Sequence, residues 1–257
     1  MSVAQNSSPQ PVADRLEALR SEITGAHCRP TDVLSFGLAS LDDRLAGGGL
    51  ARGGLHEFAA ASAELWDDAA ATLFLAGVAS RFGGRDRQVL WAVTAFDLYA
   101  PGVEQAGLSP TKVFFAQGRR NVDILAIAED ALRDGALGCV VAEVSSADMT
   151  ATRRLQLAAA DSETPLLLFR RHRSRGRCPL ETPSAAMTRW RIGSTASAPL
   201  PWSGVGRPRW RVELVRQRNG APFSLELEAC DAEGRLALPA AAADRATAAE
   251  RAVRRAA

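Results

Sequence analysis

The hydrophobic and polar positions of the chain divide it into three regions of different character. The first ten residues are polar, and Pro11–Ile23 then carries apolar residues at helical spacing, which predicts a short helix followed by a linker. From residue 31 to residue 238, short apolar runs alternate with amphipathic segments. We therefore predict a disordered N-terminus with a short helix and linker at 1–30, a core domain at 31–238, and an alanine- and arginine-rich tail at 239–257.

The pattern of the core region predicts an α/β fold. Apolar runs of strand length are separated by segments of helical periodicity, which is typical of a parallel sheet covered by helices. Gly138–Val144 is apolar except for Glu143, as expected of a strand buried on both faces. Asn121 is expected to cap the helix that follows it, and Gly135 to end that helix. The predicted strands are Val89–Val93, Val113–Ala116, Gly138–Val144 and Leu166–Phe169, and the predicted helices are Asn121–Arg133 and Thr150–Ala160.

The last part of the core alternates apolar and polar residues with a period of two. Arg189–Ile192 and Trp210–Val215 both follow this period, so the apolar residues of each run share one face. Asn219 and Gly220 then fit a tight turn that leads into Phe223–Leu227. This pattern predicts an antiparallel C-terminal hairpin added to a mostly parallel sheet.

Composition narrows the class of protein. Hydrophobic residues make up 47% of the 257 residues, which supplies a sizeable core. No apolar run approaches the roughly 20 residues that span a bilayer, and the N-terminus lacks the basic start and apolar stretch of a signal peptide. The four cysteines are widely spaced and suggest neither a zinc site nor a disulfide framework. We expect a cytoplasmic protein without a membrane segment.

The charges are segregated along the chain. The net charge is +2, but between Arg153 and Arg218 there are 14 arginines and four acidic residues, a local balance of +10 that leaves −8 for the rest. A GC-rich genome explains the use of arginine in place of lysine, but it does not explain the clustering. Segregation of this kind favours a polyanionic partner.

A glycine-rich segment carries the most specific resemblance. Leu34–Phe58, LSFGLASLDDRLAGGGLARGGLHEF, resembles the start of the RecA-like core, where the pattern SG-x-x-x-LD-x-x-L-GGG-L-x-x-G-x-x-x-E precedes the phosphate-binding loop. Further pieces follow in the same order: AFDLYAPGVEQAGL, GALGCVVAEVSS, RRLQLAAADSETPLLLF and VELVRQRNGAPFSLELE. Each piece is weak alone, but the ordered set is specific. The resemblance implies a RecA-like core with a mostly parallel central sheet, helices on both faces and an antiparallel C-terminal hairpin.

The chain departs from this pattern at the phosphate-binding loop itself. A working loop needs glycines, whose backbone N–H groups surround the phosphates, and a lysine followed by serine or threonine for charge and Mg²⁺. Ala59–Asp68 contains no glycine and no lysine, and it carries Glu64, Asp67 and Asp68. The acidic residue that would activate water directly after Val89–Val93 is also missing. We therefore predict no cofactor, no metal and no efficient ATP hydrolysis.

A RecA-like core with a degenerate phosphate loop is similar to the ImuA family of inducible-mutagenesis proteins, also described as RecA/SulA-like. The similarity covers nearly the whole chain after about residue 30. It implies a non-enzymatic accessory component of damage-inducible translesion DNA synthesis, or SOS mutagenesis. It also implies two partners: an ImuB-like homologue of Y-family polymerases and an error-prone replicative-type DNA polymerase subunit. RecA itself is a further candidate partner.

Two alternatives remain open at this stage. One is a RecA-like ATPase, which the absence of the lysine and Ser/Thr pair disfavours. The other is a regulator of RecA or of cell division in the DNA damage response, of the SulA type. The chain keeps the pattern of the whole RecA-like sheet, and SulA-like inhibitors are shorter.

A cluster of arginines follows the predicted strand Leu166–Phe169. By its order along the chain it occupies the place of the second DNA-contacting loop of RecA. Guanidinium groups suit phosphate recognition, and five of them on a flexible segment would release several counterions on binding DNA. The alternatives are contact with an acidic partner protein and a solvated loop of no specific role. The cluster comprises Arg170, Arg171, Arg173, Arg175 and Arg177.

The remaining candidates are less specific. Glu143, without a phosphate-bound Mg²⁺ beside it, is expected to be solvated or ion-paired. The tail fits a short helix that would be marginal alone, so either it frays or it is ordered by a partner, which its arginines would contact. Those arginines are Arg251, Arg254 and Arg255. Trp190 and Trp210 are expected in the core, and Trp66 and Trp202 at exposed partner contacts.

Overall fold

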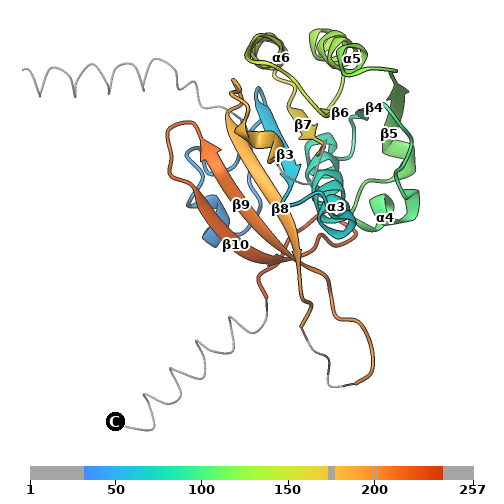
Figure 1. Ribbon diagram of the computed structural model, residues 1–257, viewed down its shortest axis with the longest axis vertical. Coiled ribbons are helices and arrows are strands. Elements are labelled where there is room, and N and C mark those ends of the chain that lie inside the picture. The colour runs from blue at the N-terminus through green and yellow to red at the C-terminus, as the bar shows by residue number, and fades with distance from the viewer. Residues whose placement is uncertain (1–31, 173–176, 199, 201, 240–257) are drawn as a thin grey trace, which may run out of the picture. The chain divides into compact units, whose positions relative to one another are not determined.

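The computed structural model describes residues 32–172, 177–198, 200 and 202–239. They contain one eight-stranded sheet of order β10-β9-β8-β3-β7-β6-β4-β5 (Figure 1). A separate two-stranded sheet precedes it in the chain. It pairs β1 (Val33–Leu34) with β2 (Leu50–Ala51), and the short helix α2 (Ala39–Asp42) lies between these strands in sequence.

The centre of the large sheet is parallel. Six strands run in one direction, from β8 through β3, β7, β6 and β4 to β5. Every residue of β3, β6 and β7 is buried, because helices cover both faces, and this explains their nearly continuous apolar sequences. The bounds are β3 (Leu55–Ala60), β4 (Val89–Val93), β5 (Val113–Gln117), β6 (Cys139–Val144), β7 (Leu166–Arg170) and β8 (Thr188–Thr195).

Two antiparallel strands complete the sheet beyond β8. β9 (Arg209–Gln217) pairs with β8, and β10 (Phe223–Glu228) pairs with β9. The turn between β9 and β10 contains Asn219 with a φ of 62°, a left-handed conformation that asparagine tolerates. The predicted antiparallel hairpin is therefore confirmed.

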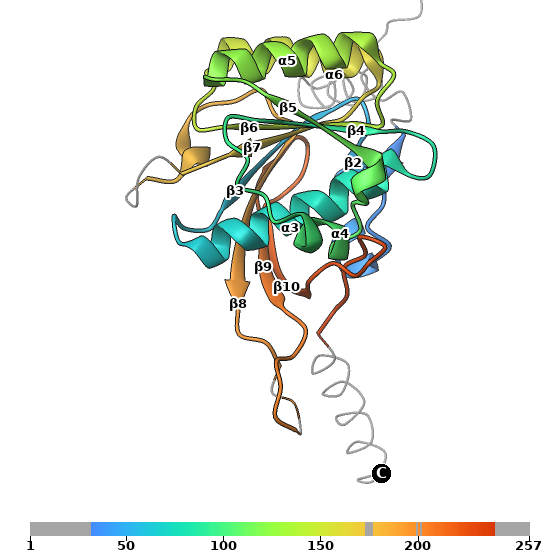
Figure 2. The same cartoon turned by 90° about the vertical axis from the view of Figure 1, so that its right-hand side faces the viewer.

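Helices lie on both faces of the sheet (Figure 2). α3 (Leu65–Gly83) and the short α4 (Ala100–Gln105) lie on one face, and α5 (Asn121–Asp134) and α6 (Met149–Ser162) on the other. α3 buries twelve of its residues, which agrees with its almost uniformly apolar sequence. α5 and α6 are amphipathic and bury only the stripe that faces the sheet. Two short 3-10 helices, Pro110–Lys112 (η1) and Pro179–Glu181 (η2), complete the described elements.

A buried histidine links β3 to its neighbour β8. His56 Nδ1 lies 2.7 Å from the Thr188 hydroxyl, and its Nε2 lies 2.9 Å from the Ala51 carbonyl oxygen. A carbonyl only accepts, so Nε2 carries the proton. The Trp190 indole N–H also donates to the Thr188 hydroxyl, at 2.7 Å. Burial lowers the pKa of His56 to about 4, and the bond to Ala51 opposes part of that shift.

The predicted elements of the core are found within a few residues of their expected ends. The prediction for Asn121 was wrong in detail, because α5 begins at Asn121 and Arg120 is its N-cap residue. The Asn121 side chain donates instead to the hydroxyls of Ser145 and Ser146, at 2.9 and 3.0 Å, which joins α5 to the end of β6. The predicted N-terminal helix and the C-terminal tail lie outside the described residues.

Candidate functional site

The connection between β3 and α3 stands where a phosphate-binding loop would lie. It comprises residues 61–64, and two of its backbone N–H groups are bonded within the protein. The Ala61 N–H donates to the Ile192 carbonyl at 2.7 Å, and the Glu64 N–H donates to the Ser62 hydroxyl at 3.2 Å. These bonds occupy backbone donors of the kind that a phosphate would need.

Asp67, in the first turn of α3, makes further hydrogen bonds that hold this connection in place. Its carboxylate accepts from the Ser62 hydroxyl at 2.6 Å and from the Ser194 N–H at 2.8 Å. The first turn of α3 is therefore joined to β8 by a carboxylate that is almost fully buried. A helix N-terminus stabilises a negative charge, and here the protein's own side chain provides it.

Beside this connection, one arginine gathers three carboxylates from different elements. The Arg171 guanidinium pairs with Asp68 of α3, with Glu143 of β6 at 2.7 Å, and with Asp97 after β4 at 3.1 Å. It also lies over the Phe169 ring, 4.8 Å from the ring centroid. We call Arg171, Asp68, Asp97 and Glu143 the acidic cluster.

Glu143 is the most buried member of the acidic cluster. Its side chain is 5% exposed, and its second partner is the Trp91 indole N–H, at 2.6 Å. Burial raises the pKa of Glu143, and the charge of Arg171 opposes part of that rise. Burial likewise raises the pKa of Asp68, again against the charge of Arg171. The prediction that Glu143 is solvated or ion-paired is therefore resolved in favour of a buried ion pair.

The acidic cluster lies at the carboxyl ends of parallel strands, where α/β folds bind their ligands. Three carboxylates surround one guanidinium, so the region has an excess of negative charge unless a carboxylate is protonated. The charge of Arg171 is already neutralised by the protein's own residues. Such a region opposes a triphosphate and offers it no free cation among the members of the cluster.

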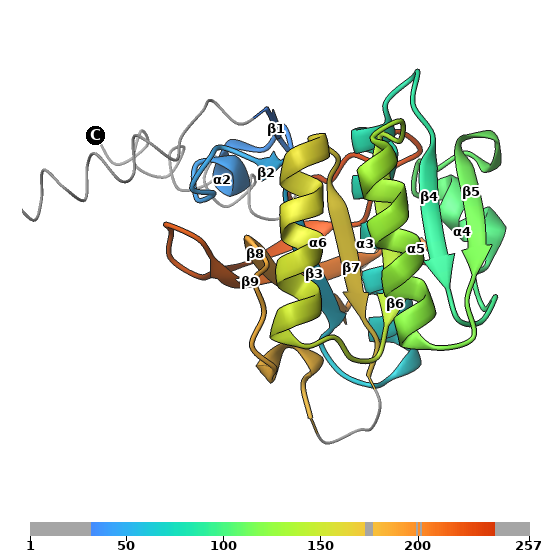
Figure 3. The ribbon, with the colours of Figure 1, turned by 90° about the horizontal axis from the view of Figure 1, so that it is seen from above.

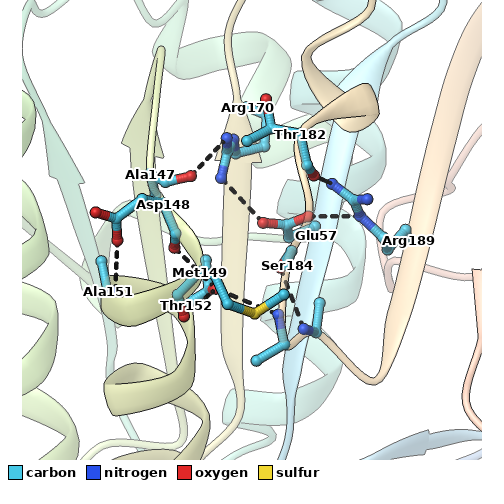
Figure 4. Close-up of polar contacts among 12 residues, drawn as sticks. Glu57, Ala147, Asp148, Met149, Ala151, Thr152, Arg170, Thr182, Ser184 and Arg189 are labelled. Carbon is cyan, nitrogen blue, oxygen red and sulfur yellow. Dashed lines mark hydrogen bonds and ion pairs between the residues drawn. The ribbon is translucent and has the colours of Figure 1, made fainter.

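A second set of charged side chains is buried between three strands of the same sheet (Figure 4). Glu57 of β3 accepts from Arg170 of β7 at 3.0 Å and from Arg189 of β8 at 2.7 Å. All three side chains are buried, and we call them the buried triad. The triad also binds two backbone carbonyls: Arg170 donates to Ala147 at 3.1 Å, and Arg189 donates to Thr182 at 2.8 Å.

The buried triad fixes the two chain segments on either side of it. The Ala147 carbonyl belongs to the connection between β6 and α6, and the Thr182 carbonyl to the segment between η2 and β8. A buried ion pair costs desolvation of each charge, which only good geometry and further hydrogen bonds repay. The triad makes two ion pairs and two bonds to carbonyl oxygens, although the buried Arg170 Nε has no hydrogen-bond partner among the described residues. These contacts position the two segments.

The structure changes the interpretation of the arginine cluster. The prediction of a nucleic-acid contact was wrong for Arg170, whose side chain is buried against Glu57 and does not reach a ligand surface. Arg171 belongs to the acidic cluster. Arg177 is exposed and pairs with Glu181 at 3.1 Å. Arg173 and Arg175 lie outside the described residues. The five arginines therefore do not act as one surface.

The other predicted residues fall into two groups. Trp190 and Trp210 are buried in the core, as predicted, and the Trp190 ring stacks on Phe58 at 6.3 Å. Trp66 and Trp202 are exposed, as predicted, although nothing in the structure shows what they contact. Arg251, Arg254 and Arg255 lie in the tail, outside the described residues.

Sequence reasoning missed Asp97. The acidic residue was sought directly after β4, whereas Asp97 comes four positions later and turns back towards Arg171. One feature of the sequence could have identified it: Asp97 lies in the short segment that directly follows the carboxyl end of the parallel strand β4. Among the described residues, no three His, Cys, Asp or Glu side chains form a group that could hold a metal ion. In the same part of the chain, no helix is long and apolar enough to cross a membrane.

The chain is similar to known proteins both in structure and in sequence. No family model matches the chain. The structure resembles the crystal structure of the RadB recombinase, with a TM-score of 0.55 and 16% sequence identity over 80% of this chain and 99% of the RadB chain. That likeness confirms the RecA-like fold.

The sequence is 39% identical to Protein ImuA of Caulobacter vibrioides over 212 residues, in each of two strains. The match covers 79% of this chain and 86% of the relative. At this identity and coverage, the chain belongs to the ImuA family.

Proposed function

We propose that the protein is a non-catalytic accessory component of damage-inducible translesion DNA synthesis. It acts with an ImuB-like homologue of Y-family polymerases and with an error-prone replicative-type DNA polymerase. Membership of the ImuA family supports the role in damage-inducible mutagenesis. The function then lies in the surfaces that the RecA-like fold presents to partners.

The acidic cluster is the observation that carries the non-catalytic part of this proposal. An ATPase of this fold needs backbone donors and a cation for the phosphates, and a base or water-positioning residue. Here Arg171 is bound by three carboxylates, and the donors at Ala61 and Glu64 are bonded internally. These contacts support a site that no longer receives a nucleotide.

Calorimetry with ATP and Mg²⁺ on the purified full chain tests the non-catalytic reading. We expect no binding at micromolar affinity and no phosphate release above background, with a RecA-type ATPase as the positive control. The variant Arg171→Gln is the matched control, because it frees the carboxylates without adding a glycine or a lysine to the loop, and it too should fail to bind. A micromolar dissociation constant for the wild type contradicts the proposal.

Mutation frequency after ultraviolet exposure tests the cellular role. Deleting the gene should abolish damage-induced mutation and leave ordinary growth intact, since no chemistry of its own is lost. Glu64→Ala, at the N-cap position of α3, should have little effect, because the Glu64 side chain makes no capping hydrogen bond to the helix. A truncation before Ala240 tests whether the tail contributes, because two tethered contacts bind more tightly than either alone. A normal mutation frequency in the deletion strain refutes the proposal.

A further inference from the structure

The sheet has an open edge at β5. β5 is the terminal strand at the end opposite β10, and no described element pairs with its outer side (Figure 3). The Gly118 N–H donates to the Val93 carbonyl of β4 at 3.0 Å. Because backbone groups alternate in direction along a strand, those of Phe115 and Gln117 point away from β4. The described residues thus leave a row of backbone donors and acceptors facing outwards.

This edge lacks the features that normally prevent pairing with another chain. Exposed edges are usually protected by charged residues, proline or a bulge. β5 has the sequence Val-Phe-Phe-Ala-Gln, and its register with β4 is continuous. Phe114 is 57% exposed and Phe115 43% exposed, and the two rings point to opposite faces of the sheet.

An apolar cavity opens beside this edge. Its volume is about 230 Å³, below the roughly 300 Å³ at which small-molecule sites begin, so it suits one or two amino-acid side chains. Phe115 stands at its wall with Phe96, edge to face at 6.0 Å between ring centroids. The cavity, which we call the β5 pocket, is lined mainly by Phe96, Leu98, Val103, Leu108, Val113 and Phe115.

The charges at the two ends of β5 indicate which kind of polypeptide segment could pair with its outer edge. The half-buried Lys112, whose ammonium also donates to the Arg85 carbonyl oxygen, directly precedes the strand, and the exposed Arg119 follows it after one glycine. A second copy of the chain paired antiparallel about Phe115 would bring Lys112 of each copy beside Arg119 of the other, and like charges oppose that arrangement. A segment with acidic residues at both ends would instead meet a cation at each end of the strand.

We propose that the outer edge of β5 binds an extended segment of a partner protein, whose bulky apolar side chain enters the β5 pocket and whose flanking residues are acidic. Main-chain hydrogen bonds to Phe115 and Gln117 supply affinity, and the pocket supplies specificity. The inference stands on the edge, the cavity and the charges, and does not depend on the role in mutagenesis.

A library of random peptides of about 16 residues, displayed on phage and selected on the purified full chain, tests the proposal. We expect the selected peptides to share a bulky apolar residue flanked by Asp or Glu. Phe115→Ser should weaken the best synthetic peptide about tenfold or more, as expected for an anchor contact. Phe114→Ser is the matched control, because it removes the same side chain from the same strand on the opposite face, and it should change affinity less than about threefold. Gln117→Pro, which removes an outward N–H, should also weaken binding.

Several results overturn the proposal. These are the selection of no peptide, the selection of basic peptides, and equal losses in Phe115→Ser and Phe114→Ser when thermal melting shows both variants folded. Sedimentation of the wild type as a dimer that Phe115→Ser dissociates assigns the edge to a second copy and also refutes the proposal. So does binding of a synthetic peptide of residues 1–31 at this edge, which would assign it to the chain's own N-terminus.

Discussion

Replacing Arg171 by alanine removes the guanidinium that pairs with all three carboxylates of the acidic cluster. The pair with Glu143 is buried, and breaking a buried pair from one side costs about 3 to 5 kcal/mol. The pair with Asp97 is far more exposed, at 60% for the Asp97 side chain, and contributes less than about 1 kcal/mol. Because Arg171 itself is 21% exposed, the lower figure applies, and we expect a loss of about 3 kcal/mol in the free energy of unfolding near neutral pH.

The destabilisation should depend on pH in a defined direction. The pKa of Glu143 is already raised by burial, and loss of Arg171 raises it further. A carboxyl with a raised pKa in the folded state binds a proton there before it does in the unfolded chain. The stability that this proton supplies is present at low pH and is lost as pH rises through the folded-state pKa. The cost of Arg171→Ala should therefore be larger near pH 8 than near pH 5.

Urea unfolding followed by circular dichroism at several pH values measures these costs. Arg177→Ala is the matched control, since its pair with Glu181 is exposed and should cost less than about 0.5 kcal/mol. Adding Glu143→Gln to Arg171→Ala should recover part of the loss, because it removes the buried charge and keeps an acceptor for Trp91. A cost that is negligible, or the same at pH 5 and pH 8, refutes the electrostatic account.

Three further predictions concern the buried triad, His56 and the arginines that follow β7. Glu57→Gln leaves the two guanidinium groups of the buried triad without a counter-charge and should cost about 3 to 5 kcal/mol in urea unfolding, whereas an unchanged midpoint would deny the triad a structural role. The pKa of His56 in the folded state is about 4 against an ordinary 6.5, so stability should fall by up to about 3 kcal/mol as pH falls through that window. His56→Gln should flatten that slope in acid titrations of stability, and an equally steep slope would assign the loss to other groups. Arg170 and Arg171 are held in ion pairs inside the protein, whereas the pair of Arg177 with Glu181 is exposed and weak. A log–log salt slope of about −2 for single-stranded DNA is therefore expected from the remaining three arginines of the sequence cluster, at roughly 0.7 per contact. Alanine at all three should abolish the slope, and an unchanged slope favours a protein partner; the residues are Arg173, Arg175 and Arg177.

The fold was predictable because local pattern and global arrangement agree along most of the chain. Continuous apolar runs such as β6 are typical of strands buried on both faces, and the two-residue period of β9 is typical of a strand with one buried face. The boundary of α5 was less predictable, because a side chain that suits a cap also suits a bridge to Ser145. Only the position of the neighbouring strand decides between those roles.

From the sequence one could predict that the phosphate-binding residues are missing, but not which contacts take their place. The sequence shows that the phosphate loop lacks glycine and lysine, but it does not show which partner each of its carboxylates finds. Asp68 and Arg171 are 103 positions apart, and their pairing follows only from the order of strands in the sheet. For the same reason Arg170 and Arg171 have different environments although they are adjacent: one is the last residue of a buried strand, and the next has just left it.

The position of β3 in the sheet has a consequence for how the chain is made. β3 lies between β7 and β8, and His56 meets its partner Thr188 only 132 positions later in the sequence. At about 5 to 20 residues per second, a ribosome needs roughly 7 to 26 s to add that length. Until Leu166–Arg170 has been made the strand Leu55–Ala60 has neither neighbour, and until β8 follows one of its sides stays unpaired, so its apolar residues are open to other contacts. Nascent chains that stop before residue 188 should therefore depend on chaperones, and complete chains should fold slowly, as expected for long-range parallel pairing.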